Sequence, residues 1–409
     1  MTTRIASATF FEQALFQMLR QQKQIAHTQL ELSSGRRILT AKDDPINAGI
    51  GEAIDRSLAE LARWRDNATQ VQNRLRLEEE TLRSIGLELQ RAQELAVQAN
   101  SAVHTRESLQ GMLEELRRIR EALIQQANTT DGTGRYLFGG TNDATAPFGV
   151  NASGGVDYFG DQRQRRIEIG PDLTVADTDP GSALFQRIRT GNGEFVVRAG
   201  ATNTGTGVLK TYGFTDRTQW TQEPFTVTFA TLPGPPPTTQ WTATQDNPPN
   251  AVVGSGTYVP GQAIAFSGIQ LVLEGDPANG DTVTVAPSTT RDVFASLQAL
   301  IDAIEMPIGT EPLKAQRLNA LFAAAEDLAQ AGQHLIDRRA SVGSRLALIE
   351  STDTQRDGEN EVLRTTLSAL RDTDYAEAIS RLTFQLQTLE ATQQSFLRVQ
   401  ELSLFNLLR

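Results

Sequence analysis

The stretch LSSGRRILTAKDDPINAGI, residues 32–50, lies between two long segments of helical periodicity and determines how they connect. Gly35 suits the position just beyond a helix end, where the backbone adopts a left-handed conformation. Asp44 can cap the following helix, and Pro45 then falls in its first turn, where a missing N–H costs nothing. The stretch therefore predicts a break between two helices, with the second helix beginning at Pro45.

C-terminal to this break, apolar residues recur at alternating spacings of four and three. The positions are Ile50, Ile54, Ser57, Leu61, Trp64, Ala68, Val71, Leu75, Glu78, Leu82, Ile85, Leu89, Ala92, Ala96 and Ala99. Only Ser57 and Glu78 interrupt the apolar series, which is typical of a coiled coil. The chain is expected to turn near residues 100–105 and to return in a helix that ends before DGTGRYLFGG, residues 131–140.

The C-terminal part of the chain has the same spacing. It runs from Leu318 to Ile349 and resumes at Leu363 after a polar interval. A last helix carries Tyr375, Ile379, Leu382, Leu386, Leu389 and Phe396, and the first helix matches it with Phe11, Leu15, Met18, Gln22, Ile25 and Leu32. We therefore expect the first and last helices to pair, and residues near 100 to lie beside residues near 320.

Between these helical ends, short β-branched or aromatic segments are bounded by Gly, Pro and Asn, as in EFVVRAG and DTVTVA. Such segments predict strands. The proline-rich stretch TLPGPPPTTQWTATQDNPPN, residues 231–250, is expected to be an exposed loop. The predicted fold class is α+β, a long coiled-coil helical rod formed by the N- and C-terminal segments with an inserted, mainly-β outer domain.

We expect five parts along the chain. Residues 1–44 form an N-terminal helix and break, residues 45–138 and 291–374 form the two halves of the rod, residues 139–290 form the β domain, and residues 375–409 form a C-terminal helix. Both terminal helices expose apolar residues on more than one face and have no domain of their own to pack into. Isolated helices are marginal in water, so we expect both ends to be loose in the monomer and ordered by neighbouring copies.

Composition limits the class of protein. The 409 residues carry a net charge of −11, with acidic and basic residues mixed along the helices, which argues against a nucleic-acid binder. The absence of cysteine excludes disulfides and Cys-based metal sites. No stretch approaches the roughly 20 apolar residues of a membrane span, so no membrane insertion is expected. The N-terminus lacks the pattern of a cleaved secretory signal, which leaves a cytoplasmic protein or one exported without such a signal.

No set of residues predicts catalysis or a cofactor. His27, His104 and His334 stand singly in helical patterns, without a second ligand at a metal-binding spacing. GTGVLK, residues 205–210, lacks the third glycine of a dinucleotide loop. Asp43 and Asp44 are interpreted as helix caps that form a local ion network with Arg36 and Arg37. We therefore expect no enzyme activity, no cofactor and no metal.

The sequence resembles the bacterial flagellin family at both ends. LSSGRRILTAKDDP (32–45) resembles the family's N-terminal signature, and DTDYAEAISRLTFQLQTLEATQQSFLRVQELSLFNLL (372–408) resembles its C-terminal helix. DDPINA (43–48) is closer to the hook-associated members than to filament flagellins. GRYLFGG (134–140), VDYFGDQRQRRIEIG (156–170) and DVFASLQALIDAI (292–304) are similar to segments of a hook-associated member. The resemblance covers residues 1–170 and 290–409.

This resemblance implies a structural subunit of the bacterial flagellum, located outside the cell and secreted without a cleaved signal through type III export. It implies a junction that connects the hook, through another hook-associated protein, to the flagellin filament. The implied partners are further copies in a ring of about eleven, another hook-associated protein, flagellin and an export chaperone. Matching the family motifs assigns subunit contacts to Ser33, Ser34, Gly35, Arg36, Lys42, Asp43, Asp44, Tyr375, Leu386, Leu389, Phe396 and Leu402.

Two alternatives remain open from the sequence. One is a filament flagellin. The other is an adhesin-like module in which the β domain binds a glycan or host surface. Its binding platform would use Tyr158, Phe159, Trp220, Trp241 and Tyr258, although aromatic residues of this kind also form β-domain cores.

Overall fold

The structure, a computed structural model, describes residues 2–100, 106–234 and 237–405 and divides into two compact units. Unit 1 contains the residues up to Asp66 together with those from Ser351 onward, and unit 2 runs from Asn67 to Glu350. Long helices precede and follow a β region that is central in the sequence, which confirms the predicted α+β fold class. The five-part division of the chain stays a proposal.

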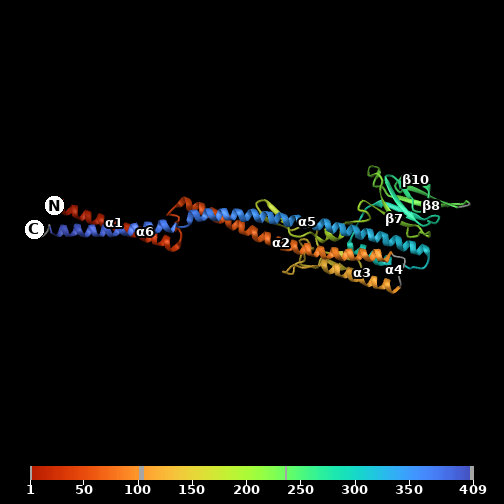
Figure 1. Ribbon diagram of the computed structural model, residues 1–409, viewed down its shortest axis with the longest axis horizontal. Coiled ribbons are helices and arrows are strands. Elements are labelled where there is room, and N and C mark those ends of the chain that lie inside the picture. The colour runs from red at the N-terminus through yellow and green to blue at the C-terminus, as the bar shows by residue number, and fades with distance from the viewer. Residues whose placement is uncertain (1, 101–105, 235–236, 406–409) are drawn as a thin grey trace. The chain divides into compact units, whose positions relative to one another are not determined.

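Six α-helices are described (Figure 1). They are α1 (Thr2–Ser34), α2 (Pro45–Ala99), α3 (Arg106–Ala127), α4 (Val293–Glu305), α5 (Glu311–Arg371) and α6 (Tyr375–Phe405). The break after Ser34 and the helix start at Pro45 are confirmed. The expected turn at residues 100–105 lies almost entirely outside the described residues.

The helical core of unit 2 follows the predicted spacing. Ala68, Val71, Leu75, Leu82 and Leu89 of α2 are fully buried in one hydrophobic cluster with apolar residues of α3, α4 and α5. The antiparallel packing of α2 on α5 is marked by the side chain of Gln93, which donates from Nε2 to the Leu328 carbonyl at 2.9 Å. This contact agrees with the expected proximity of residues near 100 and near 320.

Glu78 interrupts this apolar seam, and the structure shows which group it contacts there. Its carboxylate is fully buried and accepts a hydrogen bond from the backbone N–H of Asp179 at 3.2 Å. Burial, and then the nearby Asp179 charge, raise the pKa of Glu78 well above its usual range. The segment around Asp179 is therefore packed directly against the helical seam.

The first strands belong to the helical core. They are β1 (Phe148–Val150), β2 (Val156–Tyr158), β3 (Arg166–Gly170) and β4 (Leu173–Ala176), followed by a short π-helix, η1 (Ser182–Gln186), and by β5 (Ile188–Arg189), which pairs with β14 (Thr290–Arg291). Phe148, Ile169 and Phe185 are buried in the same cluster as α2 and α5. These strands therefore cover the helices and do not join the other strands in one β core.

The remaining strands form a separate core. The five-stranded antiparallel sheet has the order β10-β9-β8-β13-β6, and a three-stranded sheet has the order β11-β12-β7. The bounds are β6 (Phe195–Ala199), β7 (Val208–Phe214), β8 (Phe225–Leu232), β9 (Thr238–Gln245), β10 (Val252–Thr257), β11 (Ala263–Phe266), β12 (Ile269–Glu274) and β13 (Thr282–Pro287). A short 3₁₀ helix, η2 (Arg217–Gln219), follows β7. Phe195, Phe225, Phe229, Leu271 and Val285 fill the space between the sheets.

One prediction in this region was wrong. The stretch 231–250 was expected to be a loop, but it contains β9, which pairs with β8 along its whole length and with β10 on its other edge. The prolines lie outside the strand, at positions 233, 235–237, 248 and 249. They therefore remove no ladder hydrogen bond from it, and the alternation TTQWTATQ between them is free to pair.

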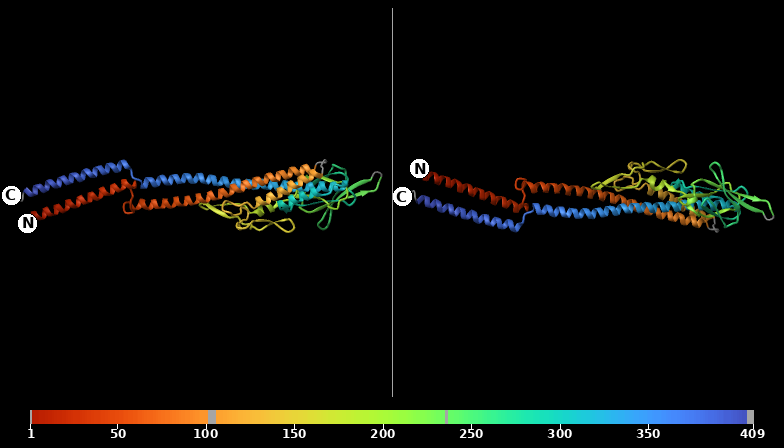
Figure 2. Two further views of the ribbon diagram at one scale, coloured as in Figure 1. Left: turned by 90° about the horizontal axis from the view of Figure 1, so that it is seen from below. Right: turned by 90° about the horizontal axis from the view of Figure 1, so that it is seen from above.

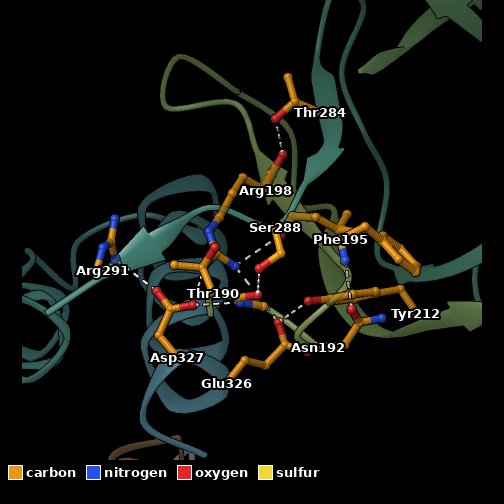
Figure 3. Close-up of polar contacts among 12 residues, drawn as sticks. Thr190, Asn192, Phe195, Arg198, Tyr212, Thr284, Ser288, Arg291, Glu326 and Asp327 are labelled. Carbon is orange, nitrogen blue, oxygen red and sulfur yellow. Dashed lines mark hydrogen bonds and ion pairs between the residues drawn. The ribbon is translucent and has the colours of Figure 1, made fainter. Parts of the chain in front are cut away.

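A charged group attaches this β core to α5 (Figure 3). The buried carboxylate of Asp327 accepts hydrogen bonds from Nη2 of Arg198 and Nη1 of Arg291, each at 2.8 Å. Beside it, the Tyr212 hydroxyl donates to Oε2 of Glu326 at 2.7 Å, and burial raises the pKa of Glu326 to about 7. Removal of one partner would leave a buried charge uncompensated, so this contact between the β core and the helix is sensitive to substitution.

Candidate assembly surface

The helices α1 and α6 pair along their lengths in unit 1. They lie side by side in the view of Figure 1, and Figure 2 shows the same from two further sides. The chain runs in opposite directions in the two helices, as the contact of Phe11 with Phe396 near one end and of Glu31 with Arg381 near the other end requires. The expected pairing of the first and last helices is confirmed.

The seam between α1 and α6 follows a heptad repeat. The less exposed residues at heptad positions a and d are Ala14, Met18, Gln21, Ile25, Thr28 and Leu32 on α1 and Ala378, Leu382, Gln385, Leu389, Thr392 and Phe396 on α6. His27, Glu31, Arg381 and Thr388, at other heptad positions, are also partly or fully buried. The rings of Phe11 and Phe396 lie 5.2 Å apart, and the Thr28 hydroxyl donates to Oε1 of Gln385 at 3.1 Å. This seam mixes apolar and polar residues, so it contributes less stability than the apolar seam of unit 2.

The two sides of this pair differ in polarity. We assign heptad position a to six seam residues, namely Phe11, Met18, Ile25, Leu382, Leu389 and Phe396. With this assignment, both Glu31 and Arg381 fall at position g. Their side chains meet across the pair at 3.6 Å. Positions flanking a seam on the same side of an antiparallel pair carry the same letter on both helices, so the observed contact supports this register. The g side is therefore polar.

The opposite side is apolar. Leu15, Ile379 and Leu386 fall at position e, and Leu19 and Leu397 fall at the adjoining position b; all five side chains are exposed by more than two fifths. In antiparallel helices, an equal rotation away from the seam brings e and b positions of both helices to the same side. We call these five residues the apolar flank. No third helix or strand among the described residues covers it.

Sequence reasoning placed Leu15, Ile379 and Leu386 in the seam, and this was wrong. Ala14, Gln21 and Gln385 take seam positions instead, although their side chains are smaller or polar. Of the predicted contact residues, Leu389 and Phe396 line the seam, whereas Tyr375 is 53% exposed and Leu386 is 47% exposed. Leu402 lies in the α6 helix, but its side chain is outside the described residues.

The break between α1 and α2 is joined to the break between α5 and α6 through the backbone. The N–H of Arg37 donates to the Arg371 carbonyl at 2.7 Å, and the N–H of Thr373 donates to the Gly35 carbonyl at 3.0 Å. Gly35 has φ of +69°, as its predicted position beyond a helix end requires, and a Cβ there would lie 2.9 Å from the Tyr375 hydroxyl. Arg36 forms an antiparallel bridge with Asp372.

Asp43 and Asp44 hold the break by hydrogen bonds. Oδ2 of Asp43 accepts from the N–H groups of Leu39 and Thr40, at 3.1 and 2.7 Å, and Oδ1 of Asp44 accepts from the N–H of Asn47 at 3.0 Å. These backbone hydrogen bonds, those of Thr40 and Asn47 first, lower the pKa of both carboxyls. The capping role predicted for Asp44 is confirmed.

The ion network expected at the break is present only in part: after the hydrogen bonds from Asn47, the charge of Arg37 also lowers the pKa of Asp44. Within residues 33–48, all described, neither arginine forms an ion pair with Asp43 or Asp44. Nη2 of Arg37 instead donates to the Leu370 carbonyl at 2.9 Å, and Asp43 lies 4.0 Å from the ring of His27. The carboxylates accept hydrogen bonds from backbone N–H groups, and the two arginines contact the break between α5 and α6.

Three further contact candidates lie at this break. Ser33 and Ser34 donate their hydroxyls back to the carbonyls of Leu30 and Glu31, at 3.0 and 3.3 Å, in the last turn of α1. Lys42 is exposed. The sequence did not single out Thr373, a buried residue whose hydroxyl donates to the Glu31 carbonyl at 3.4 Å, because a threonine between two aspartates carries no periodic signal.

The structure separates the aromatic residues of the alternative binding platform. Tyr158 packs against the helical core, whereas Trp220, Trp241 and Tyr258 belong to the β core. Phe159 is exposed and lies over Gly149. These five residues therefore do not form one surface.

Among the described residues, no group of three metal-ligating side chains is present, and no helix has the length and hydropathy to cross a membrane. His334 faces the Ala183 carbonyl at 2.8 Å, with its pKa lowered by burial. His27 lies 3.3 Å from the Glu31 carboxylate. His104 lies outside the described residues. Val208 to Lys210 of GTGVLK begin β7.

Comparison with known proteins places these features in a family. Residues 8–143 match the family described as bacterial flagellin N-terminal helical region. Over 185 residues, 45% of this chain, the sequence is 28% identical to flagellar hook-associated protein 3 of Salmonella typhimurium, and the match covers 57% of that protein. The match to the Escherichia coli protein of the same name covers 49% of that protein. The chain thus spans about half the length of the curated relatives that it matches.

Solved structures extend the likeness over most of the chain. The flagellar junction protein FlgL from Legionella pneumophila is 25% identical, with a TM-score of 0.72, over 79% of this chain and 100% of that one. FlgL from Xanthomonas campestris is 38% identical, with a TM-score of 0.70, over 77% of this chain and 99% of that one. On this identity and coverage, the chain belongs to the flagellar hook-associated protein 3 (FlgL) family.

Proposed function

We propose that this chain is a structural subunit of the bacterial flagellum that joins the hook to the flagellin filament and carries out no reaction. The proposal is supported by the family of the chain, whose relatives carry the names flagellar hook-associated protein 3 and flagellar junction protein. In such a subunit the function is mechanical. It consists of binding a copy on each side and a different protein above and below.

The observation that carries this proposal is the apolar flank of the α1–α6 pair. A two-helix pair buries only one side of each helix, and this pair leaves a second apolar stripe on both helices exposed on the same side. Exposed apolar side chains gathered on one side of a helix pair mark an association site. Phe16, Leu30 and Phe384 add exposed apolar groups on other sides of the pair. Neighbouring copies supply the missing cover.

The partners follow from this assembly. We propose a ring of about eleven copies between another hook-associated protein and the first flagellins, with the chain exported unfolded, without a cleaved signal, and held by a flagellar chaperone before export. The terminal helices are loose in the monomer because their own seam is partly polar. Placing the chain outside the cell, in the flagellum, is part of the same proposal.

The break at residues 35–44 has a second role in this proposal. Its backbone is held internally by Asp43, Asp44 and the Gly35–Thr373 hydrogen bond, so it connects α1 to α2 with a fixed local geometry. The side chains of Ser33, Arg36 and Lys42 remain exposed there. We propose that these exposed groups contact adjacent subunits, together with Tyr375 at the start of α6 and with Leu386 and Leu402 farther along α6.

Deletion of the gene tests the proposal. Hooks without filaments, with unpolymerised flagellin in the medium, are the expected result, and expression of the full chain restores filaments. A filament flagellin would give a different result, because loss of one redundant flagellin leaves some filament. Normal filaments in the deletion strain would therefore exclude the junction function.

A further inference from the structure

A cleft of about 250 Å³ lies in unit 2 between the strand pair β3–β4 and one face of α5. His334, Arg338, Ser341 and Arg345 follow one another on α5 at spacings of four, three and four, so they line a single face of the helix. Arg338, Ser341 and Arg345 form one wall of the cleft, and Arg166 and Gln164 approach from the other side. Three guanidinium groups therefore line one small opening.

The charge of Arg345 is already compensated. Its Nη2 donates to Oδ2 of Asp179 at 2.7 Å, and its Nε and Nη1 donate to the carbonyls of Ser341 and Ala176, each at 3.4 Å. Gln164 donates to the other oxygen of Asp179 at 2.5 Å. Asp179 is the only carboxylate that lines the cleft, and both of its oxygens are occupied.

Arg166 and Arg338 have no such compensation. Arg166 is fixed by hydrogen bonds from Nε to the Thr174 hydroxyl at 3.1 Å and from Nη2 to the Thr174 carbonyl at 2.9 Å. Nε of Arg338 lies 3.4 Å from Nε2 of His334, which donates to the Ala183 carbonyl at 2.8 Å and so offers Arg338 no acceptor. Within the described part of the chain, no carboxylate forms an ion pair with either residue. The cleft thus holds two guanidinium groups that no carboxylate of the described residues neutralises, of which Arg166 is held in place by Thr174.

We propose that this cleft is a binding site for an oxyanion of the carboxylate, sulfate or phosphate class. The planar fork of arginine matches two oxygens of such a group at once, and two forks from different elements enclose it from two sides. The Ser341 hydroxyl and the backbone around Thr174 supply further polar neighbours. The volume accommodates one such group with water.

The anion comes from one of two sources, a free anion in solution or an acidic side chain of a second copy. The excess of 49 acidic over 38 basic residues supplies carboxylates for the second source. Binding of a free anion does not depend on the proposed function, whereas binding of an acidic side chain from a second copy rests on it.

The first arm of the test uses inorganic phosphate and the full monomeric chain. Arginine Nε–H resonances are followed by NMR during titration with phosphate, against sodium chloride at equal ionic strength. We expect saturable shifts, and a binding constant weakened about tenfold in Arg166→Gln and in Arg338→Gln, since each loses a charged hydrogen-bond donor. Arg76→Gln is the matched control, because Arg76 is exposed in the same unit and does not line the cleft. A response equal to that of chloride, or equal weakening in all three variants, would overturn the site.

The second arm distinguishes the sources. If a neighbouring copy supplies the carboxylate, Arg166→Gln and Arg338→Gln also raise the chain concentration needed to restore filaments on hooks of the deletion strain, and Arg76→Gln does not. Phosphate binding with unchanged filament restoration assigns the site to a free anion. Should the chain prove not to act in the flagellum at all, the phosphate arm still decides whether the site exists.

Discussion

Substitution of leucines in the apolar flank by alanine tests whether neighbouring copies cover this surface. In the free chain Leu15, Leu386 and Leu397 are 46%, 47% and 57% exposed. Complete burial of a leucine side chain contributes about 1.5–3 kcal/mol, so covering the exposed half contributes about 0.7–1.5 kcal/mol per residue. Alanine retains part of this, which leaves a loss of about 0.5–1 kcal/mol for each Leu→Ala substitution.

The three positions are separated along the pair, so their losses are expected to add to about 1.5–3 kcal/mol, or roughly a ten- to hundredfold change in an association constant. The assay is the concentration of purified chain that restores filament growth on hooks from the deletion strain, at half of the maximal effect. The triple variant Leu15→Ala, Leu386→Ala, Leu397→Ala is expected to need roughly ten- to hundredfold more chain.

The matched control is Leu232→Ala, since Leu232 is 43% exposed at the end of β8 in unit 2. It removes the same side chain at the same exposure and is expected to leave the half-maximal concentration unchanged. Circular dichroism confirms that each variant retains its helix content. If the triple variant restored filaments at the wild-type concentration, the flank would not be an association surface and the reasoning from its exposure would be wrong.

Three further outcomes are expected. Gly35→Ala destabilises unit 1 by about 1–2 kcal/mol, because φ is +69° there, whereas Gly49→Ala in the interior of α2 stabilises the chain by about 0.5–1 kcal/mol. Urea unfolding followed by the circular dichroism of the helices measures both free energies. Equal effects of the two substitutions would contradict the left-handed backbone conformation of Gly35. Glu326→Gln is expected to be more stable than wild type at pH 8 but not at pH 4. The pKa of Glu326 is raised to about 7, so its contribution to stability is present below pH 4.5 and is lost as the pH rises through 7. Urea unfolding of the exposed control Glu114→Gln shows no such pH dependence, and a stability difference between Glu326→Gln and wild type that did not change with pH would argue against burial of that carboxyl. Truncation of residues 376–409 leaves the calorimetric melting of unit 2 cooperative and abolishes filament restoration; loss of that melting would show that the end helix supports the fold itself.

Local chemistry made the helical part of the fold predictable. Gly35, Asp44 and Pro45 each constrain one backbone position, so the end of α1 and the start of α2 follow from the sequence. The unit 2 seam was predictable because apolar residues fill almost every fourth and third position. Strand β9 was missed, because proline density was averaged over residues 231–250 although the prolines flank an unbroken eight-residue strand.

The assembly surface was predictable only in part. In α1 and α6 the seam contains Gln21, Thr28 and Gln385, while leucines stand on the flank, so apolar periodicity alone selects the wrong face. Pairing of charges identifies the register, because Glu31 and Arg381 fall at the same heptad position of the two helices. The backbone hydrogen bonds between the two breaks depend on residues more than three hundred positions apart, and no local signal in the sequence specifies them.

Amide hydrogen exchange along α1 and α6, compared between the free chain and the chain assembled on hooks, tests the central claim most directly. Covering by sister subunits predicts rapid exchange of both helices in the free chain, slow exchange of the unit 2 seam in both states, and strong protection of α1 and α6 after assembly. Equal protection of the two terminal helices before and after assembly would contradict it.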